Sequence, residues 1–332
     1  MSNFLYNSVN FFYDHIAGGA EYPIVDNVTD LPEVLCPKND IFNNTGQATD
    51  RSYDNLGPMW DLHKTVPLFL AIVIFPLLNF NTTTFFTKFN SLGTAAIVYL
   101  VGFVIAKSGS WGINMSSIEW ENSWRIHSTF PALTGTLAMS FFIHNIIITI
   151  MQHNRDQSKN GRDLTISYVL VTFTYVIVGA AFYVSFPLSK LCIEDNFLNN
   201  FQKWDALTVG ARVVLLFQLL TVFPLINYML RIRLLSVLFP FGNRSIISVI
   251  VVNLCVVGIC ISFARFMPYI GTVTRYTGAL SGLVYVFTLP SLLQLAILCK
   301  KNEATPTSVV LHLCIPAIGA ANLVGQLFIP SS

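Results

Sequence analysis

Apolar residues gather in eight long runs along the chain, and polar or charged stretches separate them. A helix needs about 20 apolar residues to cross the hydrocarbon core of a bilayer. The first two runs fall short of that length, so they must extend into their flanks or pack against longer neighbours. The predicted spans cover about residues 65–80, 92–106, 130–151, 165–187, 206–229, 246–266, 276–299 and 308–329. The pattern predicts an all-α integral membrane protein with a single domain over residues 1–332 and one long polar segment, 14–64.

The composition supports this class and excludes others. Hydrophobic residues make up 53% of the 332 residues and charged residues only 11%, whereas soluble domains carry about 25% charged residues. A mean hydropathy of +0.60 excludes a soluble globular enzyme. The 19 basic and 17 acidic residues leave no extended cationic surface for a nucleic acid. Nucleic acid is therefore not a partner.

The basic residues predict which loops face the cytosol, because short cytosolic loops retain Lys and Arg. Nine basic and three acidic residues fall in the four short loops 81–91, 152–164, 230–245 and 300–307. These loops are predicted to be cytosolic. The segment 14–64 then lies on the opposite, luminal side.

Glycosylation patterns agree with this orientation. Asn27, Asn43 and Asn114 begin acceptor patterns on the predicted luminal side, where glycans are added, so all three are candidate sites. Asn81 and Asn243 match the same pattern on the cytosolic side. We interpret those two as chance matches.

Two of the six cysteines, Cys36 and Cys192, lie alone in the predicted luminal loops. An oxidising compartment permits a disulfide between them. The alternative is two unrelated free thiols. The other four cysteines lie in or beside spans.

The spans contain no Asp or Glu, although Asp205 lies at the edge of one. Intramembrane proteases, proton relays and metal-dependent membrane hydrolases need acids or histidine clusters at membrane depth. His144 is the single histidine inside a span away from its edges, and the six histidines show no spacing suited to zinc or haem. The sequence therefore predicts neither an enzyme nor a resident cofactor.

The polar residues at membrane depth are neutral Asn, Gln, Thr and His side chains. Neutral oxygens and helix ends suit Na⁺ and a zwitterionic solute, whose own carboxylate and amine bring the charge. The alternative role is hydrogen bonding from helix to helix.

One predicted span, 130–151, has features of an interrupted helix. Pro131 and Gly135 precede a bulky pair of phenylalanines and then polar residues. Broken helices are where transporters place their binding backbone. The candidate substrate-lining residues are Phe142, Ile143, His144 and Asn145.

A second candidate lies on the span 206–229, where Thr221 precedes Pro224 by three residues. Proline frees a backbone carbonyl in the preceding turn, so a hydroxyl and a loosened carbonyl converge, as a Na⁺ site requires. In the rival account, Thr221 only satisfies the freed carbonyl.

The same span carries two patterns of the type proposed for sterol contact. One runs in the order basic, aromatic, apolar, and the other in the reverse order. Such patterns are common in membrane proteins rich in Phe. Their residues are Arg212, Phe217 and Leu219, then Leu225, Tyr228 and Arg231.

Several blocks of sequence give a family resemblance that runs over nearly the whole chain. The chain resembles the sodium-coupled neutral amino acid transporters, solute carrier family 38, and most closely their lysosomal branch. The blocks are Asn79–Phe80, Asn90–Thr94, Phe141–Asn145, Arg162–Leu164, Pro187–Lys190, Cys192–Glu194, Asn196–Leu198, Thr221–Val222 and Pro224–Leu225.

The resemblance implies a LeuT-like bundle of eleven helices in two inverted repeats, as in the wider APC transporters. It implies transport of amino acids of the arginine, leucine and glutamine class, with Na⁺ as the coupling ion and no cofactor. It also implies a lysosomal or late endosomal membrane location and a part in arginine-dependent activation of the growth-control complex mTORC1.

Individual positions acquire roles by the same resemblance. Cys36 and Cys192 match the family's luminal disulfide, and Thr221 matches the hydroxyl of its sodium site. The two sterol patterns match its proposed cholesterol motifs, which makes cholesterol a candidate ligand.

The chain departs from the family at its start, where Met1–Leu5 resembles the luminal end of the family's third helix. Eight full helices and a stub are therefore expected, without the segment that engages the Rag GTPases and Ragulator. The family's first helix supplies most of the substrate-binding backbone, so we expect residues 1–332 alone not to transport. Two functions stay open: an amino acid transporter, or a non-transporting membrane scaffold or partner subunit.

Overall fold

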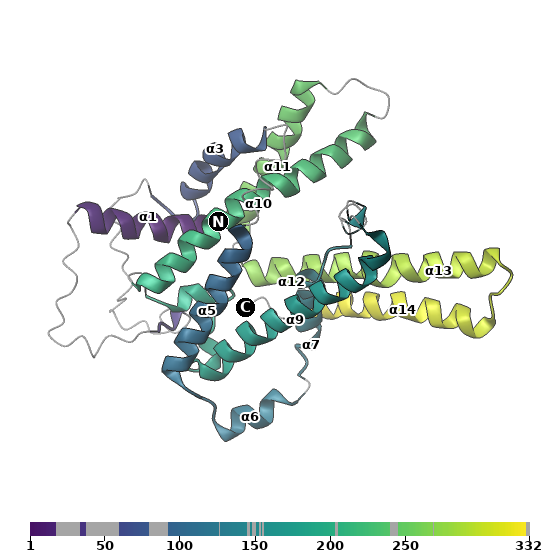
Figure 1. The fold of residues 1–332 in the computed structure, drawn as a ribbon, viewed down its shortest axis with the longest axis horizontal. Coiled ribbons are helices and arrows are strands. Elements are labelled where there is room, and N and C mark those ends of the chain that lie inside the picture. The colour runs from purple at the N-terminus through teal and green to yellow at the C-terminus, as the bar shows by residue number, and fades with distance from the viewer. Residues whose placement is uncertain are drawn as a thin grey trace. The chain divides into compact units, whose positions relative to one another are not determined.

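The structure is a computed structural model in which most of the chain is helical (Figure 1). The structure describes residues 1–17, 34–37, 60–79, 92–125, 127–144, 147, 151–152, 154, 156–202, 205–239, 245–267 and 269–329. The helices are α1 (Ser2–Ala17), α3 (Val66–Leu78), α5 (Leu92–Trp111), α6 (Ser117–Ser123), α7 (Phe130–Ser140), α9 (Asn160–Ser185), α10 (Ala206–Leu238), α11 (Ile246–Phe266), α12 (Ile270–Ser281), a π-helix (Gly282–Thr288), α13 (Leu289–Lys300) and α14 (Pro306–Gly325).

Six helical stretches among these residues are long and apolar enough to cross a membrane, which confirms the all-α integral membrane class. They match six of the eight predicted spans. The stretches are Leu92–Trp111, Gln157–Ser185, Ala206–Leu238, Ile246–Phe266, Ile270–Lys300 and Pro306–Phe328.

The two remaining predicted spans form shorter helices. α3 has 13 residues and ends where the Asn79 side chain donates a hydrogen bond of 2.8 Å to the Phe75 carbonyl. α7 has 11 residues and stops in the middle of the predicted span 130–151. The predicted stub at the chain's start is α1, with 16 residues.

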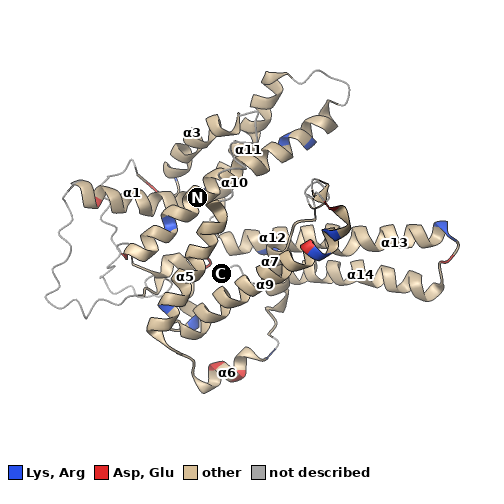
Figure 2. Cartoon of the chain, in the orientation of Figure 1, with Lys and Arg blue, Asp and Glu red and all other residues tan. Residues whose placement is uncertain are grey.

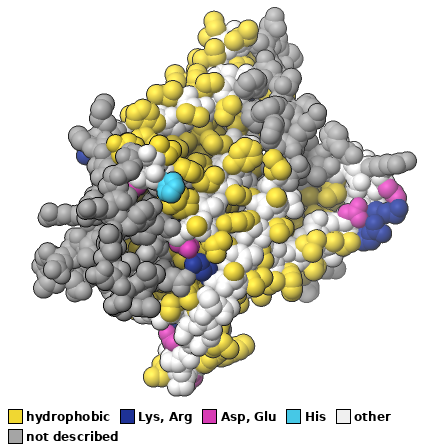
Figure 3. Space-filling view, turned by 60° about the vertical axis from the view of Figure 1, so that its left-hand side comes forward, with side chains coloured by type: hydrophobic (Ala, Val, Ile, Leu, Met, Phe, Trp, Pro, Cys, Tyr) yellow, Lys and Arg dark blue, Asp and Glu magenta, His cyan; other side chains and the backbone are white. Residues whose placement is uncertain are grey.

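Charged and apolar side chains are distributed as a membrane protein requires. In Figure 2, α13 and α14 carry no charge along most of their length. Figure 3 shows apolar side chains spread over the outer face in view. Large apolar residues such as Ile72, Val169 and Leu293 are more than 60% exposed, which in a bilayer places them against lipid.

The chain divides into two compact units. Unit 1 comprises Met1–Asn114 and Ile177–Pro268, and unit 2 comprises Met115–Val176 and Tyr269–Ser332. Helix α9 contributes to both.

Unit 1 contains both clusters of buried apolar side chains found in the described part of the chain. The smaller cluster joins α3 to α11 through Leu70, Ile74 and Val257. In the larger one, the rings of Phe103 and Phe201 meet edge to face at 5.1 Å, and Trp111 stacks on Phe201 at 5.5 Å. Such pairs stabilise by about 0.5–1.5 kcal/mol beyond their buried area.

A disulfide closes this larger cluster. Cys36 and Cys192 are bonded, as the sequence predicts, and their Cα atoms lie 4.9 Å apart. Beside them the Asn200 side chain, 0% exposed, donates to the carbonyls of Leu35 (3.1 Å) and Cys192 (2.7 Å) and accepts from the Glu194 amide (2.9 Å). We call residues 34–37 and 186–202 the disulfide cap.

Unit 2 is held together differently, by close backbone approach and polar contacts. A Cβ atom at Gly278 of α12 would lie 2.0 Å from the Gly135 carbonyl oxygen of α7, so only glycine lets these two helices cross so closely. Gln326, 0% exposed, donates to the Pro131 carbonyl of α7, and Thr134 of α7 donates to Asn322 of α14. These contacts fix α7 between α12 and α14.

Candidate functional site

The interruption expected in the span 130–151 is present at the end of α7. The helix begins with Pro131 in its first turn and ends at Ser140. The Phe141 amide still donates to Leu137 (3.0 Å), whereas the Phe142 amide donates to Met139 in a tighter turn (3.1 Å). Residues 142 and 143 are not helical, and His144 is exposed.

Of the predicted substrate-lining residues, the structure therefore brings Phe142, Ile143 and His144 together on this non-helical segment. Asn145 lies outside the described residues. The Phe142 and His144 rings lie 5.8 Å apart. We call residues 140–144 the α7 break.

Two tyrosines of α9 contact the α7 break. The Tyr175 hydroxyl donates to the Ser140 carbonyl (3.0 Å), and the Tyr168 hydroxyl donates to the Phe141 carbonyl (3.3 Å). Both rings also contact the Phe141 ring, with centroid distances of 5.4 Å for Tyr175 and 6.2 Å for Tyr168. The sequence gives no signal for these two tyrosines, because nothing in their spacing ties them to residues about 30 positions earlier.

A third tyrosine reaches the break from the π-helix Gly282–Thr288. The Phe142 and Tyr285 rings meet edge to face at 5.3 Å. π-Helices are rare and occur frequently at functional sites. This one falls inside a predicted continuous span, 276–299, and the sequence gives no signal for it.

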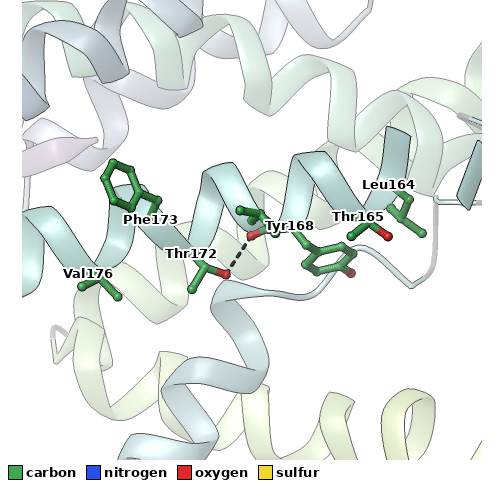
Figure 4. Close-up of a pocket in the computed structure, with 7 residues that line it drawn as sticks. Leu164, Thr165, Tyr168, Thr172, Phe173 and Val176 are labelled. Atoms are coloured by element: carbon green, nitrogen blue, oxygen red, sulfur yellow. Dashed lines mark hydrogen bonds between the residues drawn. The ribbon is translucent and has the colours of Figure 1, made fainter. Parts of the chain in front are cut away.

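A shallow hollow of about 520 Å³ runs along α9 beside these contacts (Figure 4). Tyr168 belongs both to its wall and to the α7 break. The hydroxyls of Thr172 and Thr165 are bonded within α9, to the carbonyls of Tyr168 (2.7 Å) and Gly161 (2.9 Å). The lining residues are Leu164, Thr165, Tyr168, Val169, Thr172, Phe173 and Val176, and none of them is charged.

The candidate sodium residue lies in unit 1. Thr221 is buried, 8% exposed, and its hydroxyl donates to the Gln218 carbonyl at 2.8 Å. Pro224 lies inside α10 and lacks the amide that would bond the Leu220 carbonyl. The hydroxyl is thus bonded to a different carbonyl from the one that proline frees.

The two sterol patterns have their arginines inside unit 1. Arg212 is 2% exposed and donates to the Leu198 carbonyl of the disulfide cap at 2.8 Å. Arg231 is 4% exposed and donates to the Leu78 carbonyl at the end of α3 at 2.9 Å. The apolar members Leu219 and Leu225 are half-buried and Phe217 is exposed, while Tyr228 lies under the Arg231 guanidinium at 5.2 Å. Both arginines are therefore bonded to protein carbonyls.

The candidate glycosylation sites differ in what the structure describes. Asn27 and Asn43 lie outside the described residues. The Asn114 side-chain amide donates to the carbonyls of Trp111 (3.0 Å) and Ser185 (2.8 Å). Because a glycan replaces one amide hydrogen, it would remove one of these bonds, so the structure argues against a glycan at Asn114.

Within the described ranges, no group of three or more His, Cys, Asp or Glu side chains is arranged to hold a metal ion. The site is thus built from carbonyls, hydroxyls and aromatic rings. These groups suit a ligand that carries its own charges.

Comparison with known proteins gives the family. A family model described as "Transmembrane amino acid transporter protein" matches residues 50–329. The chain belongs to this family. The match includes the α7 break, the tyrosines of α9 and the candidate sodium residue.

Individual relatives of this chain refine the family assignment. Neutral amino acid transporter 9 of Xenopus tropicalis is 39% identical over 99% of the chain and 62% of its own length. The sodium-coupled neutral amino acid transporter 9 homolog of Caenorhabditis elegans is also 39% identical, over 99% of the chain and 57% of its own length. Amino acid transporter AVT6A of Arabidopsis thaliana is 24% identical over 78% of the chain and 59% of its length.

These matches confirm the resemblance to the sodium-coupled neutral amino acid transporters. The chain spans about three fifths of the length of the curated relatives it matches.

Proposed function

We propose that these residues form the greater part of a carrier that moves amino acids across a membrane, with Na⁺ as the coupling ion. The α7 break is the observation that carries this proposal. It interrupts an apolar helix in a member of an amino acid transporter family, and it leaves backbone carbonyls beside polar side chains. The ligand's ammonium group is suited to such carbonyls, and its carboxylate to amide groups at helix ends.

The substrates proposed are amino acids of the neutral class and arginine. No Asp or Glu side chain lies within residues 130–144, so a fixed negative charge does not select for cationic substrates at the break. Neutral carbonyls accept the α-ammonium group that all amino acids share. The Xenopus relatives are named as neutral amino acid transporters, which supports this choice.

Thr221 is the proposed Na⁺ ligand on the chain. Its hydroxyl oxygen retains a lone pair while it donates to Gln218, and the Leu220 carbonyl lacks its helical partner because of Pro224. Na⁺ is transported cargo here, and these two oxygens are neutral ligands of the type that hard cations prefer.

The test is a chimera in which residues 1–332 replace the matched region of the Xenopus tropicalis relative. In proteoliposomes with a Na⁺ gradient, we expect saturable uptake of labelled glutamine, leucine or arginine. Thr221→Ala should lower Na⁺-stimulated uptake several-fold, whereas Thr174→Ala, which removes a similar helix-bonded hydroxyl of α9, should not. A chimera that is folded but transports none of these amino acids would overturn the proposal.

The second candidate function is a membrane scaffold or partner subunit without transport of its own. The chimera separates the two candidates, because a scaffold would give no uptake even when the rest of the relative is supplied. We expect no uptake from residues 1–332 alone. Uptake there would show that the remaining two fifths of the relatives' length is dispensable.

We further propose a lysosomal membrane location and a part in arginine-dependent mTORC1 activation. Both proposals are supported by the resemblance to the lysosomal branch of the family. A tagged chain should colocalise with lysosomal membrane markers, and its loss should weaken the mTORC1 response to arginine. Plasma-membrane residence would contradict the first proposal. Cholesterol, Rag GTPase and Ragulator binding are to be tested in the same cells.

A further inference from the structure

The backbone carbonyls at the end of α7 accept hydrogen bonds from side chains of another helix. The last four carbonyls of any helix lack intrahelical partners, and in lipid each unsatisfied carbonyl costs several kcal/mol. Here Ser140 and Phe141 find partners in two hydroxyl groups of another helix, from Tyr175 and Tyr168.

The two tyrosines share one face of α9. Positions 168 and 175 are seven residues apart, which is about two helical turns, so their side chains project in similar directions. Each ring contacts the Phe141 ring, stacked from Tyr168 and edge to face from Tyr175. The rings set the position of the break, and the hydroxyls set the direction of its carbonyls.

A carbonyl oxygen has two lone pairs. A tyrosine hydroxyl occupies one of them and leaves the other for a second donor. Among the described residues, no second donor to either carbonyl oxygen is found. An oriented carbonyl pair of this kind is suited to a primary ammonium group, which has three donors and no acceptor. Ser140 to His144 include no acidic side chain that would compete for that group.

Neighbouring elements of unit 2 provide a hollow that leads to the α7 break and a ring that packs on it. The hollow along α9 reaches Tyr168 itself (Figure 4). From the π-helix, Tyr285 contacts the break only through its ring on Phe142.

We propose that Tyr168 and Tyr175 are positioning residues that hold the Ser140 and Phe141 carbonyls for the ammonium group of the transported amino acid. This inference rests on the proposed transport function. The tyrosines act through the carbonyls and do not themselves need to contact the substrate.

The first test uses the chimera described above with Tyr168→Phe, Tyr175→Phe and the double variant. Each change removes a hydroxyl and keeps the ring. Loss of one hydrogen bond should raise KM about three- to tenfold, with maximal uptake little changed. Tyr183→Phe, also on α9, is the matched control, since its hydroxyl bonds no carbonyl of the break in the structure.

The second test measures how readily the α7 break is labelled, without relying on transport. In residues 1–332 with Cys255, Cys260, Cys299 and Cys314 changed to Ser, a His144→Cys variant is labelled with N-ethylmaleimide. Tyr168→Phe and Tyr175→Phe should speed labelling by loosening the break, and Tyr183→Phe should not.

The two tests distinguish the holding role of the tyrosine hydroxyls from a role in substrate binding. Unchanged labelling in both tyrosine variants would overturn the holding role. Faster labelling with unchanged KM would overturn the role in substrate binding. A chimera without any uptake would overturn the proposed function and the ammonium role together, while the labelling would still report whether the hydroxyls hold the break.

Discussion

Unit 1 and unit 2 are built on different principles. Unit 1 buries aromatic rings around Phe103 and Phe201 and closes the cluster with the disulfide cap. Among the described residues of unit 2 there is no comparable apolar cluster. Its helices are joined by a glycine crossing and by side chains bonded to backbone carbonyls.

This difference indicates which unit is the more readily rearranged. A covalent link and interlocked rings resist change, because every contact must be lost together. A few hydrogen bonds to carbonyls are exchanged at small net cost when another donor replaces them. The interrupted helix and the π-helix both lie in unit 2, so we expect unit 2 to carry the adjustable part of the transport cycle.

The largest effect is expected from removing the disulfide. Cys192→Ser should lower the free energy of unfolding by about 2–5 kcal/mol, because the bond closes a long loop of sequence separation 156. Thermal unfolding in detergent measures this change. Cys255→Ser and Cys299→Ser are controls, as both are exposed free thiols. Equal melting temperatures for Cys192→Ser and the controls would contradict the claim that the disulfide stabilises unit 1.

The next largest effect is expected from the glycine crossing of unit 2. Gly278→Ala would place a Cβ 2.0 Å from the Gly135 carbonyl oxygen, so α7 and α12 must separate, at a cost of about 1–3 kcal/mol. Gly258→Ala in α11 is the control, because a Cβ there meets nothing within 4 Å. If the melting temperature falls equally for both variants, close packing is not what holds α7.

A loss near the middle of that range is expected when the buried amide of the disulfide cap is removed. Asn200→Ala removes three hydrogen bonds and should cost about 2 kcal/mol. Asn199→Ala, which loses a single bond to Asn196, should cost less than half as much. The ratio of the two losses, measured by chemical unfolding, shows how far the cap depends on polar contacts as well as on the disulfide.

No measurable change in glycan loading is expected from Asn114→Gln. The Asn114 amide is already bonded to two carbonyls, so the glycosidase-sensitive mobility shift should be the same with and without this change. Asn27→Gln with Asn43→Gln should abolish the shift. A shift that persists in this double variant and disappears with Asn81→Gln would reverse the predicted orientation.

The pattern of apolar runs was enough to predict the all-α membrane class, the approximate position of six membrane-length helices and the pairing of Cys36 with Cys192. These features depend on local composition. Hydrocarbon forces each apolar run to satisfy its own backbone as a helix, and two cysteines alone on one side of a membrane have no other partner on that side. The interruption near Phe142 was also visible, because bulky and polar residues end an otherwise apolar helix.

Only the tertiary structure decided which groups meet at that interruption. Tyr168, Tyr175 and Tyr285 come from other helices, and a hydroxyl contact of 3.0 Å across 35 residues leaves no mark in local sequence. The burial of Arg212 and Arg231 was likewise hidden, since a basic residue beside an aromatic one reads the same whether it faces lipid or a helix end. Local patterns determine where helices form, but a shared site is decided by the angles and depths at which those helices pack.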